Sequence, residues 1–164
     1  MRLYGIVGWK DTGKTDLVER LVTEIVGRGL AVSTLKHAHQ GFDIDHSGRD
    51  SDRHRRAGAT EVLVSSPARW ALMHELRGEP EPGIDDLLLQ LSPVDLVLIE
   101  GFKRSGVPKI ETYRAEVGNR LLALDNPTIR AVASDAPHDG LHAPLFDLND
   151  TAGIADFILE DVGL

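Results

Sequence analysis

Residues 8 to 15, GWKDTGKT, have the types and spacing of a phosphate-binding loop, G-x-x-x-x-G-K-[ST]. Gly8 and Gly13 permit backbone conformations in which several N–H groups turn toward one anion. Lys14 can reach the terminal phosphates of a nucleotide, and the hydroxyl of Thr15 can bind Mg²⁺. The predicted nucleotide-binding set is completed by the remaining loop residues and the residue that follows: Lys10, Asp11, Thr12 and Asp16.

Two charged residues of this segment need separate interpretation. Asp16 stands where many such loops carry a Ser or Thr that supports the α-phosphate. A carboxylate pointing inward would repel an anion, so we expect Asp16 to face away as an acid in the first helical turn, leaving only its N–H for phosphate. Lys10 either adds charge toward a phosphate, across a dimer for example, or offsets Asp11 in solvent. The second interpretation of Lys10 is favoured.

An acid for the metal is expected at the end of the apolar run in VDLVLIEGF, residues 94 to 102. Leu96 to Ile99 are typical of a buried strand, and ligands bind at the carboxyl ends of parallel strands. Glu100 ends this run, whereas Asp95 precedes it. Glu100 is therefore the candidate metal and catalytic residue, either binding Mg²⁺ with Thr15 or orienting a water. The alternative is an acid that only caps the end of a strand.

Composition limits the possible partners. The chain has 164 residues, a formal net charge of −8 and no cysteine. An acidic chain is a poor ligand for bulk nucleic acid or anionic membranes, so we expect neither as a partner. No apolar run approaches the roughly 20 residues of a membrane span, and a strand from residue 2 leaves no room for a signal peptide. We expect one cytoplasmic domain over residues 1–164.

The hydrophobic pattern around the loop predicts a βαβ unit. A strand over 2–7 enters the loop, apolar residues recur at helical spacing from Leu17 to Val26, and a second strand covers 30–37. Such a unit implies a parallel sheet with a right-handed crossover. We expect an α/β fold of the P-loop NTPase type, a mostly parallel sheet with helices on both faces. Further strands are predicted at 60–66, 70–76, 94–102, 109–113 and 129–135, and helices at 49–57, 84–91 and 150–159, the last capped by Asp150 or Thr151.

Asp135 is the candidate for base recognition. It lies in ASDAP, residues 133–137, after a late strand at the carboxyl edge of the sheet. A carboxylate there could accept from guanine N1 and N2, whereas adenine offers no such paired donors. A capped turn before Pro137 explains the same residues equally well.

Basic residues cluster locally in this acidic chain. Within eight positions lie Arg49, Arg53, Arg55 and Arg56, downstream of Lys36, His37 and His39. They form a candidate site for a small anion. The alternative is a solvated helix face paired with nearby Asp residues.

Several segments together resemble the MobB-type molybdopterin-guanine dinucleotide biosynthesis adaptor proteins. They are GWKDTGKT, STLKHAHQGFDIDHSGRDSDRHRRAGA, RWALMHE, VDLVLIEGFK and AVASDAP. The resemblance runs from residue 3 to about residue 160, essentially the whole chain. The loop alone is shared by hundreds of families. The series K-H-x-H, D-x-D, G-[KR]-D-S and A-G-A followed by E-G-F-K is much more selective.

The resemblance implies a homodimeric protein that binds GTP and Mg²⁺, with at most slow GTPase activity. Its implied partner is the guanylyltransferase that joins GMP to molybdopterin, and molybdopterin itself is a further candidate ligand. By position, Thr12 to Thr15 would hold phosphates and Glu100 would belong to the metal site. Asp43 or Asp45 would complete the Mg²⁺ shell. The segment from Lys36 to Arg56 would face the partner or the pterin phosphate.

The residues themselves also favour slow hydrolysis. Gly101, Phe102 and Lys103 follow Glu100, so no glutamine stands where a water-positioning residue often lies. A catalytic arginine, Arg49 or Arg53, could still approach. Without such parts, phosphoryl transfer loses factors of about 10³ to 10⁵. The alternative function is a P-loop kinase or ligase that activates a small anionic substrate near residues 49–56.

The histidines allow three interpretations. His37, His39 and His46, with Asp43 and Asp45, could form a transition-metal site. Because positions 37 and 39 straddle a strand end, both side chains need not face the same way. One histidine could instead bind a phosphate or pterin. An ordinary surface or dimer role is the third possibility.

Overall fold

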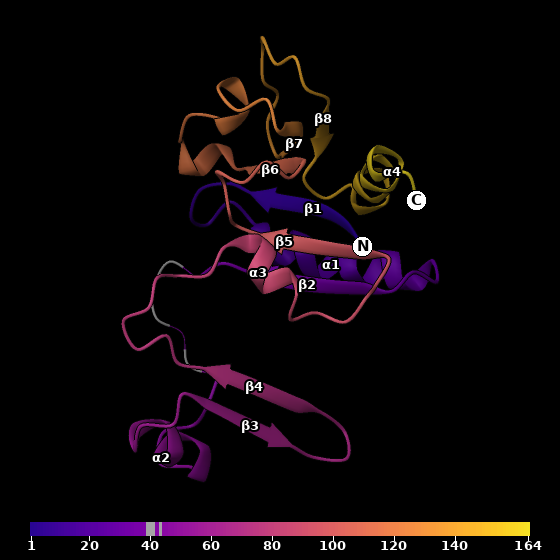
Figure 1. The fold of residues 1–164 in the computed structure, drawn as a ribbon. Helices are drawn as coiled ribbons and strands as arrows, with labels where there is room; N and C mark the ends of the chain where they lie inside the picture. Colours follow the sequence, from indigo (N-terminus) through magenta and orange to yellow (C-terminus); the bar gives the residue numbers. More distant parts are fainter. Residues whose placement is uncertain (39–41, 43) are drawn as a thin grey trace. The chain divides into compact units, whose positions relative to one another are not determined.

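The computed structural model describes residues 1–38, 42 and 44–164, which form two compact units. The first unit comprises Met1–His37 and Leu88–Leu164, and the second comprises Ala38–Leu87. Figure 1 labels their helices and strands. His39 and Asp43, which the sequence suggests as possible metal ligands, lie outside the described residues.

The first unit is built on a six-stranded sheet in the order β2-β5-β1-β6-β7-β8 (Figure 1). All its neighbouring strands pair in parallel, so their carboxyl ends lie at one edge. The predicted α/β fold with a mostly parallel sheet is confirmed. The strands are β1 (Arg2–Val7), β2 (Val32–Lys36), β5 (Leu96–Glu100), β6 (Lys109–Tyr113), β7 (Ile129–Ser134) and β8 (Leu145–Asp147).

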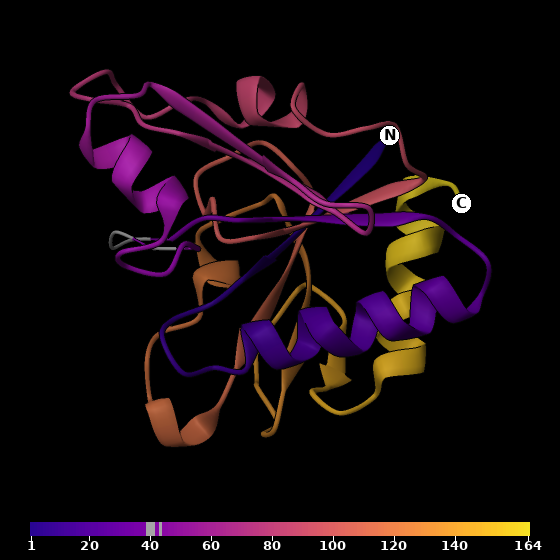
Figure 2. The ribbon, with the colours of Figure 1, turned by 90° about the horizontal axis from the view of Figure 1, so that it is seen from below.

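Two helices cover one face of this sheet. Helix α1 (Lys14–Gly27) and helix α4 (Thr151–Val162) contact each other and lie on the same side, as Figure 2 shows. Leu17, Leu21 and Ile25 of α1 are fully buried in one core with Ile154 and Ile158 of α4. The helical spacing of these apolar residues is what turns each helix onto the sheet.

The opposite face is partly covered by the short 3₁₀ helix η2 (Leu122–Leu124). Ile110 of β6 points into the core with α1 and α4, so its neighbour Glu111 points to the other face. There the Glu111 carboxylate accepts from the N–H groups of Leu122 and Ala123 at 2.9 and 2.8 Å. Burial raises the pKa of Glu111, and these two donors oppose that shift.

Most predicted helix and strand positions are confirmed, with shifted boundaries. The strand predicted at 94–102 is β5, Leu96–Glu100, and the helix predicted at 84–91 is α3, Ile84–Leu88. The Asp150 carboxylate caps α4, accepting from Gly153 N–H at 3.0 Å. The sequence did not predict β8, a three-residue strand too short for a clear pattern.

The second unit contains helix α2 (Asp50–Arg56) and a hairpin of β3 (Glu61–Ser65) and β4 (Trp70–His74). The hairpin is antiparallel and forms a sheet of its own. Asp52 is buried in this unit, where its carboxylate binds Gly48 N–H at 2.8 Å and Arg56 Nε at 2.9 Å. Among the described residues, no helix is both long and apolar enough to span a bilayer.

Candidate functional site

The loop between β1 and α1 is shaped by close contact with β6. Gly8 has φ of +153°, and a Cβ there would lie 2.6 Å from the carbonyl oxygen of Thr112 and 2.6 Å from Thr12 Oγ1. Thr12 is buried, and its hydroxyl lies 2.8 Å from the Thr112 hydroxyl and donates to the Trp9 carbonyl at 2.9 Å. Only glycine fits at position 8, and the threonine pair fixes the loop to the sheet.

The loop delivers the amino end of α1 to the carboxyl edge of the sheet. Gly13 is the N-cap residue, with φ of +88° and no side-chain cap. The first helical hydrogen bond runs from Leu17 N–H to the Gly13 carbonyl, at 2.9 Å. The N–H groups of Lys14, Thr15 and Asp16 precede that bond and therefore have no partner within the helix. Such an end attracts phosphate through its N–H groups and its dipole.

Lys14 lies among charged side chains of both signs. Its ammonium donates to the Trp9 carbonyl of its own loop at 2.5 Å. Burial lowers the pKa of Lys14; Lys103 and Lys36 lower it further, while Glu100 and Asp11 oppose the shift. Lys14 itself, Lys36 and Lys103 thus bring three cations close to the loop, beside the two acids Glu100 and Asp11.

Two predicted metal residues meet at the mouth of the loop. Thr15 Oγ1 donates to Glu100 Oε1 at 2.9 Å. The Lys36 ammonium lies 3.2 Å from the same carboxylate oxygen and 3.3 Å from the Thr15 hydroxyl. Hydroxyl and carboxylate oxygens are the hard ligands that Mg²⁺ prefers, so the donor set fits this ion. In this structure the Lys36 ammonium lies against both the Thr15 hydroxyl and the Glu100 carboxylate oxygen.

Asp45 belongs to the second unit. Its Oδ1 accepts from the Ser51 hydroxyl at 2.9 Å and from His46 N–H at 3.0 Å, and Oδ2 lies 3.5 Å from Arg55 Nε. Its part in a metal shell stays a prediction. Within the described ranges, no group of three or more His, Asp or Glu side chains is arranged to hold a metal ion.

The charged loop residues differ in orientation. The Asp16 carboxylate pairs with Arg20 of the next turn at 3.1 Å and is 63% exposed, in agreement with the expectation that it faces away from the loop. Lys10 and Asp11 are both exposed. Asp11 has φ of +65°, so the loop requires a left-handed backbone conformation at this position as well as at Gly13.

Asp135 directly follows β7 at the carboxyl edge and is exposed. Its Oδ1 accepts from Ala115 N–H at 2.8 Å, a contact that joins the end of β7 to the segment after β6. Beside it, Ser134 Oγ lies 3.0 Å from His138 Nε2. The carboxylate thus has a backbone partner that the sequence did not indicate, in addition to its proposed role with the base.

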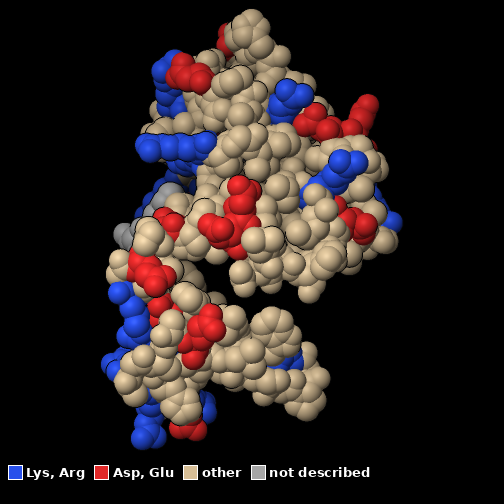
Figure 3. All heavy atoms as spheres, in the orientation of Figure 1, with Lys and Arg blue, Asp and Glu red and all other residues tan. Residues whose placement is uncertain are grey.

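The predicted basic cluster is divided between the two units. Lys36 and His37 belong to the first unit, where the His37 ring stacks on Phe102 with centroids 4.5 Å apart. Arg53 pairs with Asp50 at 3.8 Å and Arg56 with Asp52 at 2.9 Å, as in the alternative of an ion-paired helix face. Figure 3 shows Lys and Arg side chains gathered beside α2 in the second unit. Arg49, the N-cap residue of α2, is exposed.

Three residues near the loop are not singled out by the sequence alone. Thr112 bonds to Thr12, the Lys103 ammonium lies 4.2 Å from the centroid of the Trp9 ring, and Arg114 lies against Gly13. All three are at, or just beyond, the carboxyl ends of β5 and β6. The rule that ligands gather at this edge, applied to every strand, would have found them.

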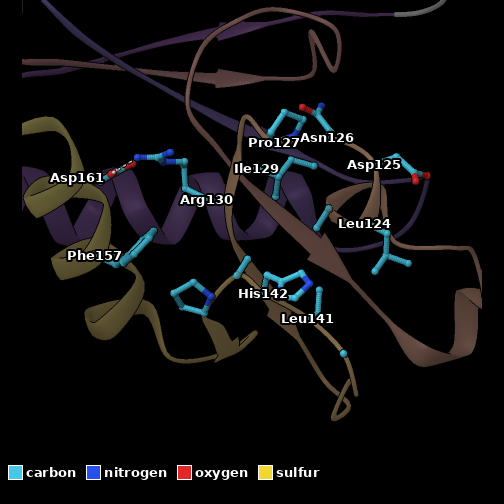
Figure 4. Close-up of a pocket in the computed structure, with 14 residues that line it drawn as sticks. Leu124, Asp125, Asn126, Pro127, Ile129, Arg130, Leu141, His142, Phe157 and Asp161 are labelled. Atoms are coloured by element: carbon cyan, nitrogen blue, oxygen red, sulfur yellow. Dashed lines mark ion pairs between the residues drawn. The ribbon is translucent and has the colours of Figure 1, made fainter.

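A cavity of about 740 Å³ lies elsewhere, at the amino end of β7. In Figure 4 its walls include Ile129, Leu141, His142 and Phe157, with an ion pair between Arg130 and Asp161 at 3.7 Å. No residue of the phosphate-loop segment 8–15 lines this cavity. The candidate phosphate loop lies at the opposite edge of the sheet, where the carboxyl ends of the strands meet.

The family described as molybdopterin guanine dinucleotide synthesis protein B, MobB, matches residues 3–135. A molybdopterin-guanine dinucleotide biosynthesis adapter protein of Escherichia coli is 40% identical over 162 residues, covering 96% of this chain and 91% of that protein. The adapter protein of Haemophilus influenzae is 39% identical over 159 residues, covering 95% and 86%.

Solved structures agree with these sequence relatives. A crystal structure of molybdopterin-guanine biosynthesis protein B superposes with a TM-score of 0.74 at 29% identity, covering 99% of both chains. A MobB homologue from Bacillus stearothermophilus gives a TM-score of 0.71 at 27% identity, again over 99% of both chains. By sequence over nearly its whole length and by fold, the chain belongs to the MobB family of molybdopterin guanine dinucleotide synthesis proteins.

Proposed function

We propose that residues 1–164 act as one GTP-binding adapter that assists the attachment of GMP to molybdopterin. The relatives in the MobB family are named as adapter proteins of molybdopterin-guanine dinucleotide biosynthesis. The observation that carries the nucleotide part is the loop itself: uncapped helix N–H groups beside Lys14, with Thr15 and Glu100 in contact at its mouth. The proposed partner is the guanylyltransferase, and molybdopterin is the candidate second ligand.

The end of the loop and the residues around it have distinct roles in this proposal. The N–H groups of residues 13–16 bind phosphate oxygens, and Lys14 exchanges the Trp9 carbonyl for the phosphates. Thr15 and Glu100 hold Mg²⁺, which neutralises charge on the β- and γ-phosphates when bound. Because two cations repel, Lys36 leaves these oxygens when the metal binds them. Asp135 accepts from the guanine base.

Hydrolysis is slow in this proposal because no glutamine follows Glu100 to position a water. The next residues are Gly101, with φ of +100°, and Phe102, whose ring is stacked on His37. Lys103 follows, and its ammonium lies over Trp9. None of these side chains can orient water as a glutamine does, and this absence costs a large part of the usual acceleration.

The adapter function is tested by turnover and by binding in the reconstituted system. Phosphate release is measured with GTP alone and with the guanylyltransferase and molybdopterin added. Slow release, well below about one per second, with GTP-dependent complex formation supports the adapter. Transfer of phosphate to a small acceptor at several per second would instead establish the kinase or ligase alternative.

Glu100→Gln separates nucleotide binding from metal dependence. GDP affinity in EDTA is expected to change by less than about threefold, whereas hydrolysis falls about 10- to 100-fold and the gain in affinity from Mg²⁺ is lost. Calorimetric titrations with and without Mg²⁺, together with phosphate release, measure both effects. Asp95→Asn is the control, since Asp95 precedes the same strand at its other end and binds Ala31 N–H at 2.8 Å. Unchanged Mg²⁺ dependence in Glu100→Gln would remove this residue from the metal site.

We propose that the second unit contributes the homodimer interface. The side chains of Leu63, Trp70 and Leu72 share one face of the hairpin and are 60%, 64% and 42% exposed. A contiguous apolar face on a two-stranded sheet is unstable in water, and such faces typically mark protein–protein contacts.

Substituting Lys at both Leu63 and Leu72 is expected to convert the dimer to a monomer at micromolar concentration, because two charges would be buried in the interface. Sedimentation equilibrium measures the mass. Leu89→Lys is the matched control, since Leu89 is 81% exposed in the first unit and should leave the dimer intact. A wild-type chain that sediments as a monomer would contradict the proposal.

A further inference from the structure

Arg114 lies directly against the phosphate loop. It follows the last residue of β6, at the same sheet edge as the loop. A Cβ built on Gly13 would be 3.3 Å from Arg114 Nε and 3.4 Å from Nη2. The guanidinium therefore packs on the Cα atom of the residue that precedes Lys14.

The charge of Arg114 has no counter-charge in the described part of the chain. Its side chain is half-buried, yet no carboxylate there lies within 4.0 Å and no described group accepts a hydrogen bond from it. Several other arginines of the first unit are paired, among them Arg20 with Asp16, Arg28 with Asp156 and Arg120 with Asp125. A half-buried guanidinium beside an anion-binding loop is placed to receive an anion.

The backbone around Arg114 is fixed on both sides. The Arg114 carbonyl accepts from Val117 N–H at 3.1 Å, and Ala115 N–H donates to Asp135 at 2.8 Å. On the preceding residue, the Tyr113 ring meets His138 edge-on at 4.4 Å. The main chain that carries Arg114 is therefore held to the end of β7, although the guanidinium itself binds no described acceptor.

The order of the strands tells which part of a nucleotide Arg114 can meet. Lys36 and Glu100 end β2 and β5 on one side of β1, where the metal and terminal phosphates are proposed. Arg114 and Asp135 follow β6 and β7 on the other side, where the base is proposed. A nucleotide lying across the loop passes from γ-phosphate to base in this direction. Its α-phosphate is then the phosphate nearest to β6.

Asp16 leaves a place for such a contact. It stands where other loops use a hydroxyl for the α-phosphate, and its carboxylate is turned to Arg20. We propose that Arg114 binds the α-phosphate of the nucleotide and replaces the hydroxyl that this loop lacks. The proposal rests on the nucleotide binding proposed above, and it assigns to Arg114 a specific phosphate rather than general attraction.

Binding of GDP and GTP to Arg114→Ala tests the assignment. Affinity for both nucleotides is expected to fall by the same factor, about tenfold or more, because both carry an α-phosphate. Arg114→Lys should restore part of the loss, since an ammonium keeps the charge but not the planar pair of donors. Arg120→Ala is the matched control: Arg120 lies in the same segment, is exposed, and pairs with Asp125 at 2.8 Å. Its GDP affinity should stay near that of the wild type.

A readout that a merely structural residue would not change is the stereochemistry at the α-phosphorus. GDP with sulfur in place of one non-bridging α-oxygen exists as two diastereomers. The wild type should prefer one of them, and Arg114→Ala should lose the preference. Arg114→Gln removes the charge but keeps side-chain bulk against Gly13. It should lose the same preference, and it replaces Arg114→Ala in the experiment if that variant folds poorly.

The possible failures are distinct. Equal GDP affinity in wild type and Arg114→Ala, or a loss confined to GTP, overturns the α-phosphate assignment while the proposed function stands. A diastereomer preference that survives in Arg114→Ala does the same. If the wild-type protein binds neither GDP nor GTP, the proposed function fails and the assignment fails with it.

Discussion

Replacing Lys14 by alanine is expected to lower the affinity for GDP and GTP by about 10- to 100-fold. A charge-assisted hydrogen bond to phosphate contributes roughly 1.5–3 kcal/mol, and each 1.4 kcal/mol is tenfold in affinity. Burial already lowers the pKa of Lys14, so its ammonium loses hydration in the free protein and gains more from a phosphate. Isothermal titration calorimetry with each nucleotide measures the loss.

Lys10→Ala is the control for this experiment. Lys10 carries the same charge in the same loop but is exposed, and solvent screens its interaction with a phosphate. We expect its affinity to stay within about threefold of the wild type. If both lysine variants lost affinity equally, the loop would bind by net charge and not through the position of Lys14.

Gly8→Ala is expected to abolish measurable nucleotide binding and to destabilise the fold by about 2–4 kcal/mol. The new methyl would lie 2.6 Å from the Thr112 carbonyl, a backbone atom of β6 that cannot move without breaking sheet pairing. The residue would also keep a positive φ, which costs about 1–3 kcal/mol. Denaturant unfolding gives the stability, and calorimetry gives the binding.

Gly29→Ala separates the two causes. Gly29 has φ of +89° at the end of α1, but a Cβ there meets nothing within 4 Å. Its alanine variant therefore carries only the conformational strain, about 1 kcal/mol, and should bind nucleotide normally. The difference between the two variants in unfolding free energy and in nucleotide affinity measures the effect of the clash with β6. A Gly8→Ala protein that binds GDP like the wild type would show that this approach is dispensable.

The local part of the site could be predicted because local rules determine it. The loop pattern, the strand before it and the amphipathic helix after it are encoded within residues 2–27, and the structure has them there. Glu100 could also be placed, since a buried apolar run followed by an acid indicates a strand end. The structure brings Glu100 to 2.9 Å from Thr15, which is 85 positions away in sequence.

The remaining features depend on contacts that no local pattern encodes. The partners of Arg53 and Arg56 were ambiguous because nearby Asp residues and external anions offer the same charge. Strands 61–65 and 70–74 were found, but their separation into a sheet of their own follows from long-range pairing. Arg114 was not singled out, because its proposed role depends on its contact with Gly13, which lies about a hundred positions earlier in the loop between β1 and α1.

The ammonium of Lys36, lying against both Thr15 and Glu100, has a consequence for the proposed release of metal and nucleotide. A carboxylate that loses a bound metal must be solvated by water or change its conformation, and either process would slow release. Here Lys36 would supply the neutralising charge again once the metal has left, because its long side chain would only have to rotate back. In the proposed function, the protein would then release its nucleotide to the enzyme without leaving the Glu100 carboxylate unpaired.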